Sequence, residues 1–257
     1  MPSNLDKREV RAPFDNRVLG EVPLTDSGLA EKALSTATEL HKSKSKPTLA
    51  ERIEILRRLV GIMSKNKEEL ALQAANEGGK PLIDSLVEIE RGIDGVEVCI
   101  EVLRGEQGHV IPMRVTPSSA NRLAFTQSFP VGPVMAVSAF NHPFNLIVHQ
   151  CIPAIAVGCP VIVKPAEATP MSAHSISEML IEAGLPKGWC QVVNTTDLTV
   201  ASKLVTDPRI GFFSFIGSGA VGWRLRSQLA PGTRCGLEHG GVAPVIIEPD
   251  ADKERVV

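Results

Sequence analysis

The feature that most constrains the fold is an alternation of apolar runs and helical segments that begins near Val131. It predicts strands at 133–139, 161–164, 190–194, 210–216 and 243–247, and helices at 144–157, 170–183, 198–205 and 218–229. Strands that alternate with helices form parallel sheets whose two faces are covered by those helices. The sequence therefore predicts an α/β protein built on a parallel sheet.

One stretch of this pattern, Val137–Thr169, places polar residues where two predicted strands end. The first strand is followed by F-N-H-P, in which Pro143 suits the first turn of a helix because it lacks a backbone N–H. The second strand ends at Lys164, and Glu167 follows it. Because ligands of open α/β sheets bind at the carboxyl ends of the strands, we expect Asn141, Lys164 and Glu167 to lie near one another.

The segment before this sheet is predicted to contain a hairpin and several helices. Short β-type runs at 8–24 favour a small hairpin. Thr48 and Glu51 form a capping box, in which each side chain accepts a free backbone N–H, and a helical stripe of apolar residues follows. This helix is expected to end at Gly78-Gly79, and the next to run from Pro81 to about Gly105.

Residues 108–130 have a different pattern, in which β-type residues alternate and prolines interrupt them. The pattern predicts a two-stranded arm, although an ordinary surface hairpin would give the same signal. The chain is thus expected to divide into a hairpin and helices at 1–107, an arm at 108–130 and an α/β core at 131–257.

Composition excludes several functional classes. A net charge of −2 gives no basic field that would attract nucleic acid or acidic membranes. The charged N-terminus has no apolar core, so no secretory signal is expected, and the broken apolar runs predict no membrane span. The 5 cysteines are scattered without a C-x-x-C pair, which favours free thiols in a cytoplasmic protein. The 6 histidines show no metal-ligand spacing, so no metal is expected.

A glycine-rich turn at Gly217–Gly222 matches G-x-G-x-x-G, follows an apolar run and opens a predicted helix. This pattern is typical of a turn that approaches the pyrophosphate of a dinucleotide. In that fingerprint an acid further on, here Glu238, binds the ribose, which is the alternative of an ordinary Rossmann-type reductase. The fingerprint belongs to the first βαβ unit, however, and several strand–helix units precede it here. A glycine-rich turn without a ligand also fits.

Four motifs in this order, A-F-N-H-P, V-K-P-A-E-x-T-P, F-S-F-I-G-S and L-E-H-G-G, resemble the aldehyde dehydrogenase superfamily over essentially the whole chain. The resemblance implies a Rossmann-like sheet, an arm at 108–130 that forms homo-oligomers, and NAD-dependent oxidation of an aldehyde to a carboxylic acid through a cysteine thioester. The chain corresponds to about half of a usual member, without the catalytic domain that carries the nucleophilic cysteine. The resemblance therefore implies a cofactor-binding half that is inactive alone.

The same resemblance assigns catalytic roles to two residues. The amide of Asn141 would donate to the developing oxyanion, and Glu238 would be the general base that directs water onto the thioester. Apolar neighbours are expected to raise the pKa of Glu238. A turn asparagine and a structural glutamate are the alternatives. His239 stands where an apolar residue is common in the family, and Val242 where lysine is common.

The cofactor would be held at the ends of the strands. Lys164 and Glu167 would bind the ribose hydroxyls, and the carboxylate would repel a 2′-phosphate, which favours NAD over NADP. An exposed ion pair is the alternative. Further cofactor contacts are expected at Ala139, Phe140, Gly217, Ser218, Val221 and Gly240. The family often has a glycine in the next loop, where this chain has Asn194-Thr195-Thr196.

None of the cysteines lies in a glycine-rich exposed turn such as a thiolate nucleophile requires. Cys99 and Cys151 fall in predicted helices, and Cys159 and Cys190 at the entries to strands. Cys235 precedes Glu238 on one strand. All five are expected to be inert thiols, so none is assigned as catalytic. A competing hypothesis is a non-catalytic relative that binds a nucleotide or a partner chain.

Overall fold

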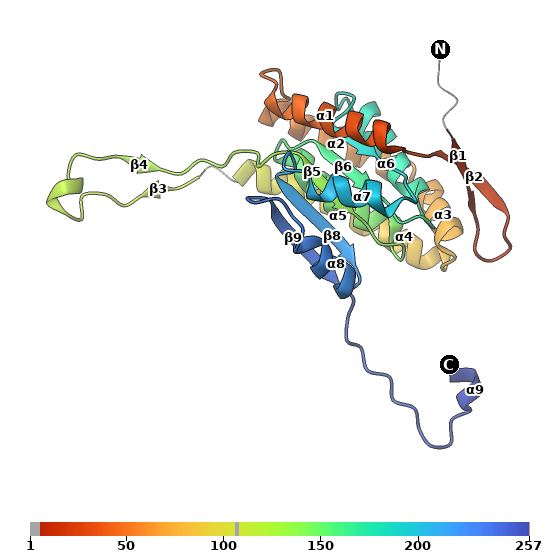
Figure 1. Cartoon of the computed structure of the whole chain (residues 1–257). Coiled ribbons are helices and arrows are strands. Elements are labelled where there is room, and N and C mark those ends of the chain that lie inside the picture. The colour runs from red at the N-terminus through yellow and green to blue at the C-terminus, as the bar shows by residue number, and fades with distance from the viewer. Residues whose placement is uncertain (1–5, 106–107, 257) are drawn as a thin grey trace, which may run out of the picture.

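The computed structural model describes residues 6–105 and 108–256, and its central element is a five-stranded sheet in the order β7-β6-β5-β8-β9 (Figure 1). The strands are β5 (Val134–Val137), β6 (Val161–Lys164), β7 (Cys190–Val192), β8 (Phe212–Gly217) and β9 (Arg234–His239). Every pairing in this sheet is parallel, which confirms the predicted α/β class.

The helices and the remaining strands follow one another along the chain. The helices are α1 (Ser27–Lys42), α2 (Leu49–Lys65), α3 (Lys67–Gly78), α4 (Leu82–Gly105), α5 (Pro143–Ala156), α6 (Met171–Glu182), α7 (Leu198–Thr206), α8 (Gly219–Arg226) and α9 (Lys253–Val256). Two short antiparallel pairs are formed by β1 (Lys7–Arg11) with β2 (Val18–Pro23) and by β3 (Val110–Ile111) with β4 (Ala124–Phe125). None of the described helices is both long enough and apolar enough to cross a membrane.

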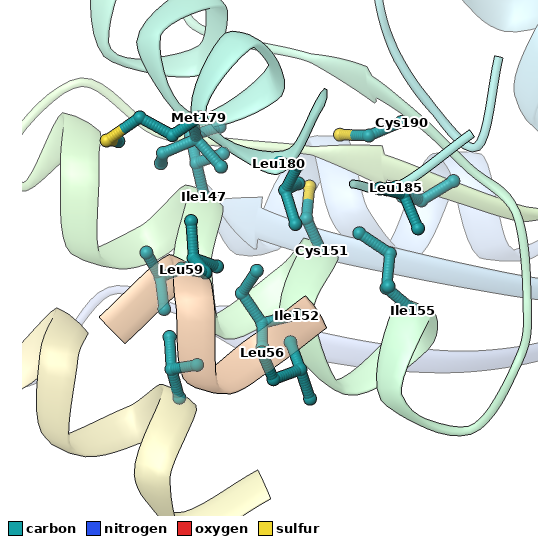
Figure 2. Packing of buried hydrophobic residues seen from close by; sticks show 14 of the residues in the cluster. Leu56, Leu59, Ile147, Cys151, Ile152, Ile155, Met179, Leu180, Leu185 and Cys190 are labelled. Atoms are coloured by element: carbon teal, nitrogen blue, oxygen red, sulfur yellow. The ribbon is translucent and has the colours of Figure 1, made fainter. Parts of the chain in front are cut away.

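The sheet separates two apolar clusters because side chains alternate between its faces. On β6, Val161 and Val163 pack on one side with α2, α4, α5 and α6, whereas Ile162 packs on the other with α1 and α7. Figure 2 shows Leu56 and Leu59 of α2 against side chains of α5 and α6 in the first cluster. Phe144 and Trp189 are completely or almost completely buried there, and burying each contributes about 2–3 kcal/mol.

Local signals account for most of the helix boundaries. Thr48 and Glu51 form the predicted capping box, with the Glu51 N–H donating to the Thr48 hydroxyl and the Thr48 N–H to the Glu51 carboxylate. Pro143 lies in the first turn of α5, as predicted, and the helix begins there, one residue before the predicted start at 144. The single helix expected up to Gly78-Gly79 is wrong, since Asn66 leaves the helical conformation and separates α2 from α3.

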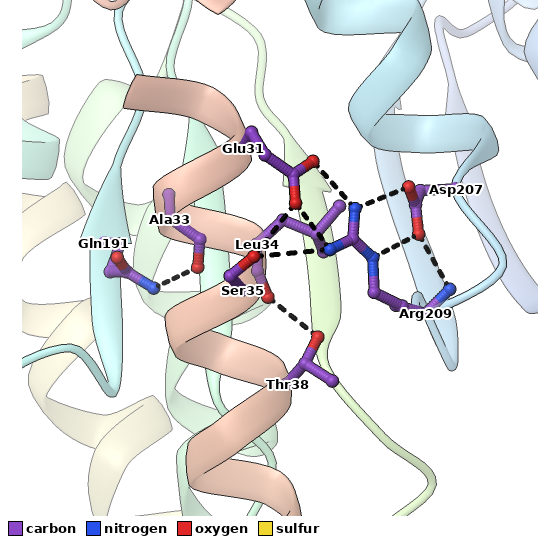
Figure 3. Close-up of polar contacts among 8 residues, drawn as sticks. All are labelled: Glu31, Ala33, Leu34, Ser35, Thr38, Gln191, Asp207 and Arg209. Carbon is purple, nitrogen blue, oxygen red and sulfur yellow. Dashed lines mark hydrogen bonds and ion pairs between the residues drawn. The ribbon is translucent and has the colours of Figure 1, made fainter. Parts of the chain in front are cut away.

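Helix α1 was not predicted from the sequence, although its N-terminal signal is present. The Asp26 side chain accepts the Leu29 N–H at the start of this helix. Figure 3 shows how α1 is held against the sheet, because the Arg209 guanidinium donates to the carboxylates of both Glu31 and Asp207. The Gln191 side chain also donates to the Ala33 carbonyl of α1, at 2.9 Å.

The β3–β4 pair lies in an extension that projects away from the body of the molecule (Figure 1). The expected hairpin at 8–24 corresponds to β1–β2. Parts of the expected segments, residues 1–5, 106–107 and 257, lie outside the described residues.

Two expectations at the C-terminal end are wrong. Residues 243–247 form no strand; they lie beyond β9, and Val245 and Ile246 are exposed. Their β-type sequence has no adjacent strand to pair with in the described chain, and an isolated strand is not stable. The helix expected at 218–229 is shorter, because α8 ends at Arg226.

Candidate functional site

The candidate site lies where the five parallel strands end. In the sheet register Val137 is opposite both Lys164 of β6 and Phe215 of β8, so the carboxyl ends of the strands meet at one edge. The chain passes from β5 outward to β6 and β7, then returns to place β8 on the other side of β5. Such a topological switch point leaves a crevice that binds ligands in open α/β sheets.

The structure brings the predicted residues to this edge. Asn141 follows β5, Lys164 ends β6, Gly217 ends β8, and Glu238 lies near the end of β9. Alternation then divides them between the two faces. Lys164 lies two residues after Ile162 and therefore on the same face of the sheet, that of α1 and α7. Leu237 also packs on the α1 and α7 side, so its neighbour Glu238 points to the opposite side, that of α5.

Lys164 is half-buried, and burial lowers the pKa of its ammonium group, while the nearby Glu167 carboxylate acts in the opposite direction. The only hydrogen bond of this ammonium group in the described structure is a long one of 3.5 Å to the Pro165 carbonyl. A cation with unused donors at a strand end fits an oxygen-rich ligand such as a ribose.

Glu167 has a partner that the sequence did not indicate. Its carboxylate lies 3.0 Å from Nη1 of Arg8, which belongs to β1. Glu167 also lies near Lys164, since its carboxylate acts on the pKa of the Lys164 ammonium, so the site contains two cations rather than one. No local pattern in the first residues marks Arg8, because only the packing of the hairpin places it there.

The loop after β7 holds the N-terminal hairpin. The Asn194 amide donates to the Pro23 carbonyl at 3.1 Å, and the Thr25 N–H donates to the Asn194 carbonyl at 2.7 Å. Thr195 and Thr196 line a small pocket together with Arg8 and Glu167. The departure from the family pattern at 194–196 thus has a structural role.

The glycine-rich turn joins β8 to α8, and packing explains two of its glycines. A Cβ at Gly217 would approach the Phe215 ring to 2.7 Å, and one at Gly222 would approach His239 to 2.4 Å. Gly219 is more open, since a Cβ there would come no closer than 3.9 Å to His239. The turn follows the fourth strand of the sheet in chain order, which argues against the ordinary Rossmann fingerprint.

The N-terminus of α8 fits an anionic group. Ser218 is the N-cap residue, and its side chain makes no capping hydrogen bond. The first N–H groups of the helix therefore remain available for an acceptor such as a pyrophosphate. Val221 in the first turn packs against the apolar cluster, so its contact with a ligand would be limited to its exposed part.

Asn141 is exposed and precedes α5, whose start is fixed by a buried carboxylate. Glu88 of α4 accepts the backbone N–H groups of Phe144 and Asn145 at 2.8 and 2.9 Å. Lys80 forms an ion pair with Glu88 and also lies 3.4 Å from the Asn141 carbonyl oxygen. This network positions Asn141.

Neither Lys80 nor Glu88 was identified from the sequence. A signal was present, because Glu88 lies three residues after Ser85 and four before Gly92 on the buried stripe of α4. A carboxylate on such a stripe needs a partner.

A pocket of about 390 Å³ lies beside Asn141. Val87 and Leu146 form an apolar part of its lining, and the rest is polar with charges of both signs: Lys80, Asp84, Glu88, Arg91, His142 and Asn145. Asn145 is buried, and its side-chain oxygen has no hydrogen-bond partner among the described residues. Arg91 is exposed. These groups could recognise a polar substrate.

Glu238 does not have the apolar surroundings that were expected. Its side chain is exposed because β9 is the edge strand of the sheet and nothing in the described chain covers this face. Gly240 is exposed as well, and Phe140 is 62% exposed. Ala139 is half-buried.

All five cysteines are free thiols, and three of them, Cys151, Cys159 and Cys190, are buried. A hydrogen bond with Cys190 and complete burial raise the pKa of Cys151, and burial raises that of Cys99. Raised values disfavour the thiolate form that attacks a carbonyl. Among residues 6–105 and 108–256, no three His, Cys, Asp or Glu side chains are grouped so that they could hold a metal ion.

Comparison with known proteins identifies a family. The model of the aldehyde dehydrogenase family matches residues 1–257. A 3-sulfolactaldehyde dehydrogenase from Priestia aryabhattai is 34% identical over 250 residues, covering 97% of this chain and 52% of the relative. A mitochondrial succinate-semialdehyde dehydrogenase from Arabidopsis thaliana is 33% identical, covering 97% of this chain and 47% of the relative. The chain spans about half the length of these relatives.

Solved structures agree with this fold. Aldehyde dehydrogenase 21 from Physcomitrella patens, in complex with the reaction product succinate, has a TM-score of 0.89 at 31% identity, covering 95% of this chain and 50% of that one. An NADP-dependent glyceraldehyde-3-phosphate dehydrogenase from Bacillus halodurans C-125, in complex with NADP, has a TM-score of 0.88 at 26% identity, covering 96% of this chain and 52% of that one.

Proposed function

Because this chain belongs to the aldehyde dehydrogenase family, we propose that it forms the cofactor-binding part of an NAD-dependent aldehyde dehydrogenase that oxidises an aldehyde to a carboxylic acid. One observation carries the proposal. β5, β6 and β8 end side by side, so the half-buried Lys164, the start of the Gly217-Ser218 turn and the segment that leads from β5 to Asn141 lie at one edge of the sheet. Solved structures of relatives include complexes with NADP and with NAD+, so relatives in this family bind NAD(P).

The residues at this edge fit a dinucleotide. Lys164 would donate to a ribose hydroxyl, and the free N–H groups at the start of α8 would face the pyrophosphate. Ala139, Phe140, Val221 and Gly240 would provide further contacts. When bound, the nicotinamide ring accepts a hydride from the substrate carbon. We propose NAD rather than NADP, because the Glu167 carboxylate would accept from ribose hydroxyls and repel a 2′-phosphate.

Two residues are proposed to act on the substrate. Asn141 would donate its side-chain amide to the oxyanion, and the Glu88 network keeps the start of α5 in place for that purpose. Glu238, which lies on the α5 side of the sheet but is itself uncovered at the edge strand β9, would accept a proton from the water that hydrolyses the thioester. The raised pKa of the Cys151 and Cys99 thiols argues against them as nucleophiles. We propose that the nucleophilic cysteine lies outside residues 1–257 and that this chain alone does not turn over.

The substrate is proposed to be an aldehyde with an anionic group at its far end. The pocket beside Asn141 offers the Arg91 guanidinium and the Asn145 side chain. Asp84 also lines the pocket and would repel an anionic group, so the attraction of that group to Arg91 has to exceed its repulsion by Asp84. The substrates named for two relatives, 3-sulfolactaldehyde and succinate semialdehyde, support this choice, since both carry an acidic group.

Two further proposals concern the molecule as a whole. The projecting arm at 108–130 exposes Val110, Phe125 and Phe129, and such apolar groups suit contact with a second copy of the chain. Free cysteines suit a reducing compartment, so we propose a cytoplasmic protein.

The test is a calorimetric titration of the whole chain with NAD. We expect binding, and we expect Lys164→Ala to weaken it about tenfold through the loss of charge-assisted hydrogen bonds. Lys187→Ala, an exposed lysine before β7, is the matched control. Absence of heat from a folded sample that also shows no cofactor-dependent thermal shift would contradict the proposal.

A further inference from the structure

We propose that Arg8, which comes from the N-terminal hairpin, is a specificity-determining residue of the cofactor site and increases its affinity for a dinucleotide with a 2′-phosphate. This inference rests on the proposed function. In the proposed function, the Glu167 carboxylate repels a 2′-phosphate, and the positive charge of Arg8 reduces this repulsion.

The contact between Arg8 and Glu167 joins parts of the chain that are far apart in the sequence. Arg8 Nη1 lies 3.0 Å from Glu167 Oε2, and the two side chains are 39% and 43% exposed. Both residues line the same pocket, together with Thr195 and Thr196. Both groups are partly exposed and lie close enough to Lys164 to act on the pKa of its ammonium, which Glu167 raises and Arg8 lowers, so both would lie near a ribose held by Lys164.

The guanidinium changes the charge that a phosphate would meet. Lys164 and Glu167 alone form a neutral pair, and addition of Arg8 leaves one net positive charge. A guanidinium has five N–H donors, and its planar fork matches the oxygens of a phosphate. The contact with Glu167 occupies one Nη, so other N–H donors remain free for a second oxygen-rich group.

The hairpin is fixed, so Arg8 does not have to be ordered by the ligand. Asn194 bonds to both Pro23 and Thr25, and the Leu24 N–H donates to the Asp6 carbonyl at 2.7 Å. On β1, Arg8 alternates with Lys7, whose ammonium pairs with Glu21 at 3.1 Å. Because neighbouring residues of a strand point to opposite faces, Lys7 has the same charge but is directed away from Glu167.

The experiment compares the affinities of the whole chain for NAD and NADP by calorimetry, for the native sequence and for Arg8→Met. We expect Arg8→Met to weaken NADP about tenfold relative to NAD, as the loss of a charge-assisted phosphate contact would do. Lys7→Met removes the same charge from the other face and is expected to leave the ratio unchanged. Glu167→Gln is expected to shift the ratio in the opposite direction, toward NADP.

A second variant separates charge from geometry. Arg8→Lys keeps the positive charge but loses the planar, forked guanidinium. The ratio of its affinity for NADP to its affinity for NAD should therefore fall between the ratios of the native chain and of Arg8→Met. This variant also serves if Arg8→Met fails to fold, as judged by circular dichroism. A ratio that is unchanged by both substitutions, or that shifts toward NADP, overturns the role of Arg8. Failure of the native chain to bind either cofactor overturns the proposed function and this inference with it.

Discussion

The Glu88 carboxylate of α4 accepts the backbone N–H of Phe144 at 2.8 Å and thereby caps α5 from another helix. The same carboxylate accepts the Asn145 N–H and forms an ion pair with Lys80, whose side chain is only 14% exposed. A completely buried charge is tolerated only when it is paired and hydrogen-bonded, as it is here. The position of Asn141 at the front of α5 therefore depends on a residue that does not belong to that helix.

Replacement of Glu88 by alanine should be strongly destabilising. It removes the carboxylate that accepts the Phe144 and Asn145 backbone N–H groups, and it leaves the Lys80 ammonium without its partner, which costs roughly 3–5 kcal/mol. Urea denaturation would measure the loss. Glu90→Ala is the matched control, since Glu90 pairs with Lys67 on the exposed side of the same helix and should change stability by less than about 1 kcal/mol. Equal effects of the two substitutions would show that Glu88 does not cap α5.

A second buried carboxylate, Glu77, should make stability depend on pH. It accepts the N–H groups of Met171 and Ser172 at the start of α6, and burial raises its pKa from 4.5 to about 7. Since the folded state holds the proton more tightly than the unfolded state, its contribution is complete below pH 4.5. It decreases as the pH rises to about 7, by roughly 3 kcal/mol in total.

The Glu77 effect can be isolated by denaturation at several pH values. Glu77→Gln keeps the shape of the side chain without the titration, so the difference in unfolding free energy between native chain and variant should change between pH 4.5 and 7. A difference that stays constant over this range would mean that Glu77 does not titrate there.

The stability of the protein should require glycine at position 222, because the His239 ring leaves no room for a larger side chain. An alanine Cβ at position 222 would lie 2.4 Å from His239 Cε1, and such overpacking costs about 1–3 kcal/mol. Gly219→Ala, in the same helix with open space, should be neutral or slightly stabilising in thermal unfolding. His239→Ala should restore part of the stability of Gly222→Ala, because the new Cβ would still lie 3.0 Å from the Phe215 ring. If Gly222→Ala is as stable as Gly219→Ala, the close packing against His239 is incorrect.

The ion pair between Arg209 and Glu31 of α1 should be lost in acid. Hydrogen bonds from Arg209 and Ser35 lower the pKa of Glu31 to about 2 (Figure 3). A lowered value means that this contribution is present above the usual pKa of 4.5 and is lost as the pH falls toward 2. Arg209→Ala removes the guanidinium that donates to Glu31, so it should accelerate amide hydrogen exchange across α1 even at neutral pH. Arg224→Ala, an exposed arginine in α8, should leave the exchange of α1 unchanged.

The choice of substrate should depend on Arg91. In a full-length protein that contains this chain, Arg91→Ala should raise KM for succinate semialdehyde about tenfold with little change in kcat, because a charge-assisted contact outside the reacting centre is lost. KM for a neutral aldehyde such as propanal should stay constant. Arg104→Ala, an exposed arginine of the same helix, controls for the loss of charge. An equal change for both aldehydes would contradict the anionic substrate.

Much of the fold could be predicted from local patterns. The strands that became β5, β6, β7 and β8 were located by their apolar runs, and α5 by Pro143 at its start. The wrong and missing predictions also arose from reading local patterns. The run at 243–247 has β-type residues and no neighbouring strand, whereas α1 has an ordinary helical sequence that was not recognised.

The sequence by itself determined the class of fold and the residues at the ends of the strands, because alternation and helix signals act over a few residues. Only the tertiary structure decided which distant groups meet there. Arg8 and Glu167, Glu88 and Phe144, and Gly222 and His239 are brought together by the order of the strands and the packing of helices. The physical reason is that each of these contacts depends on the relative positions of two segments that are separate in the sequence, and the local sequence of one segment does not determine the position of the other.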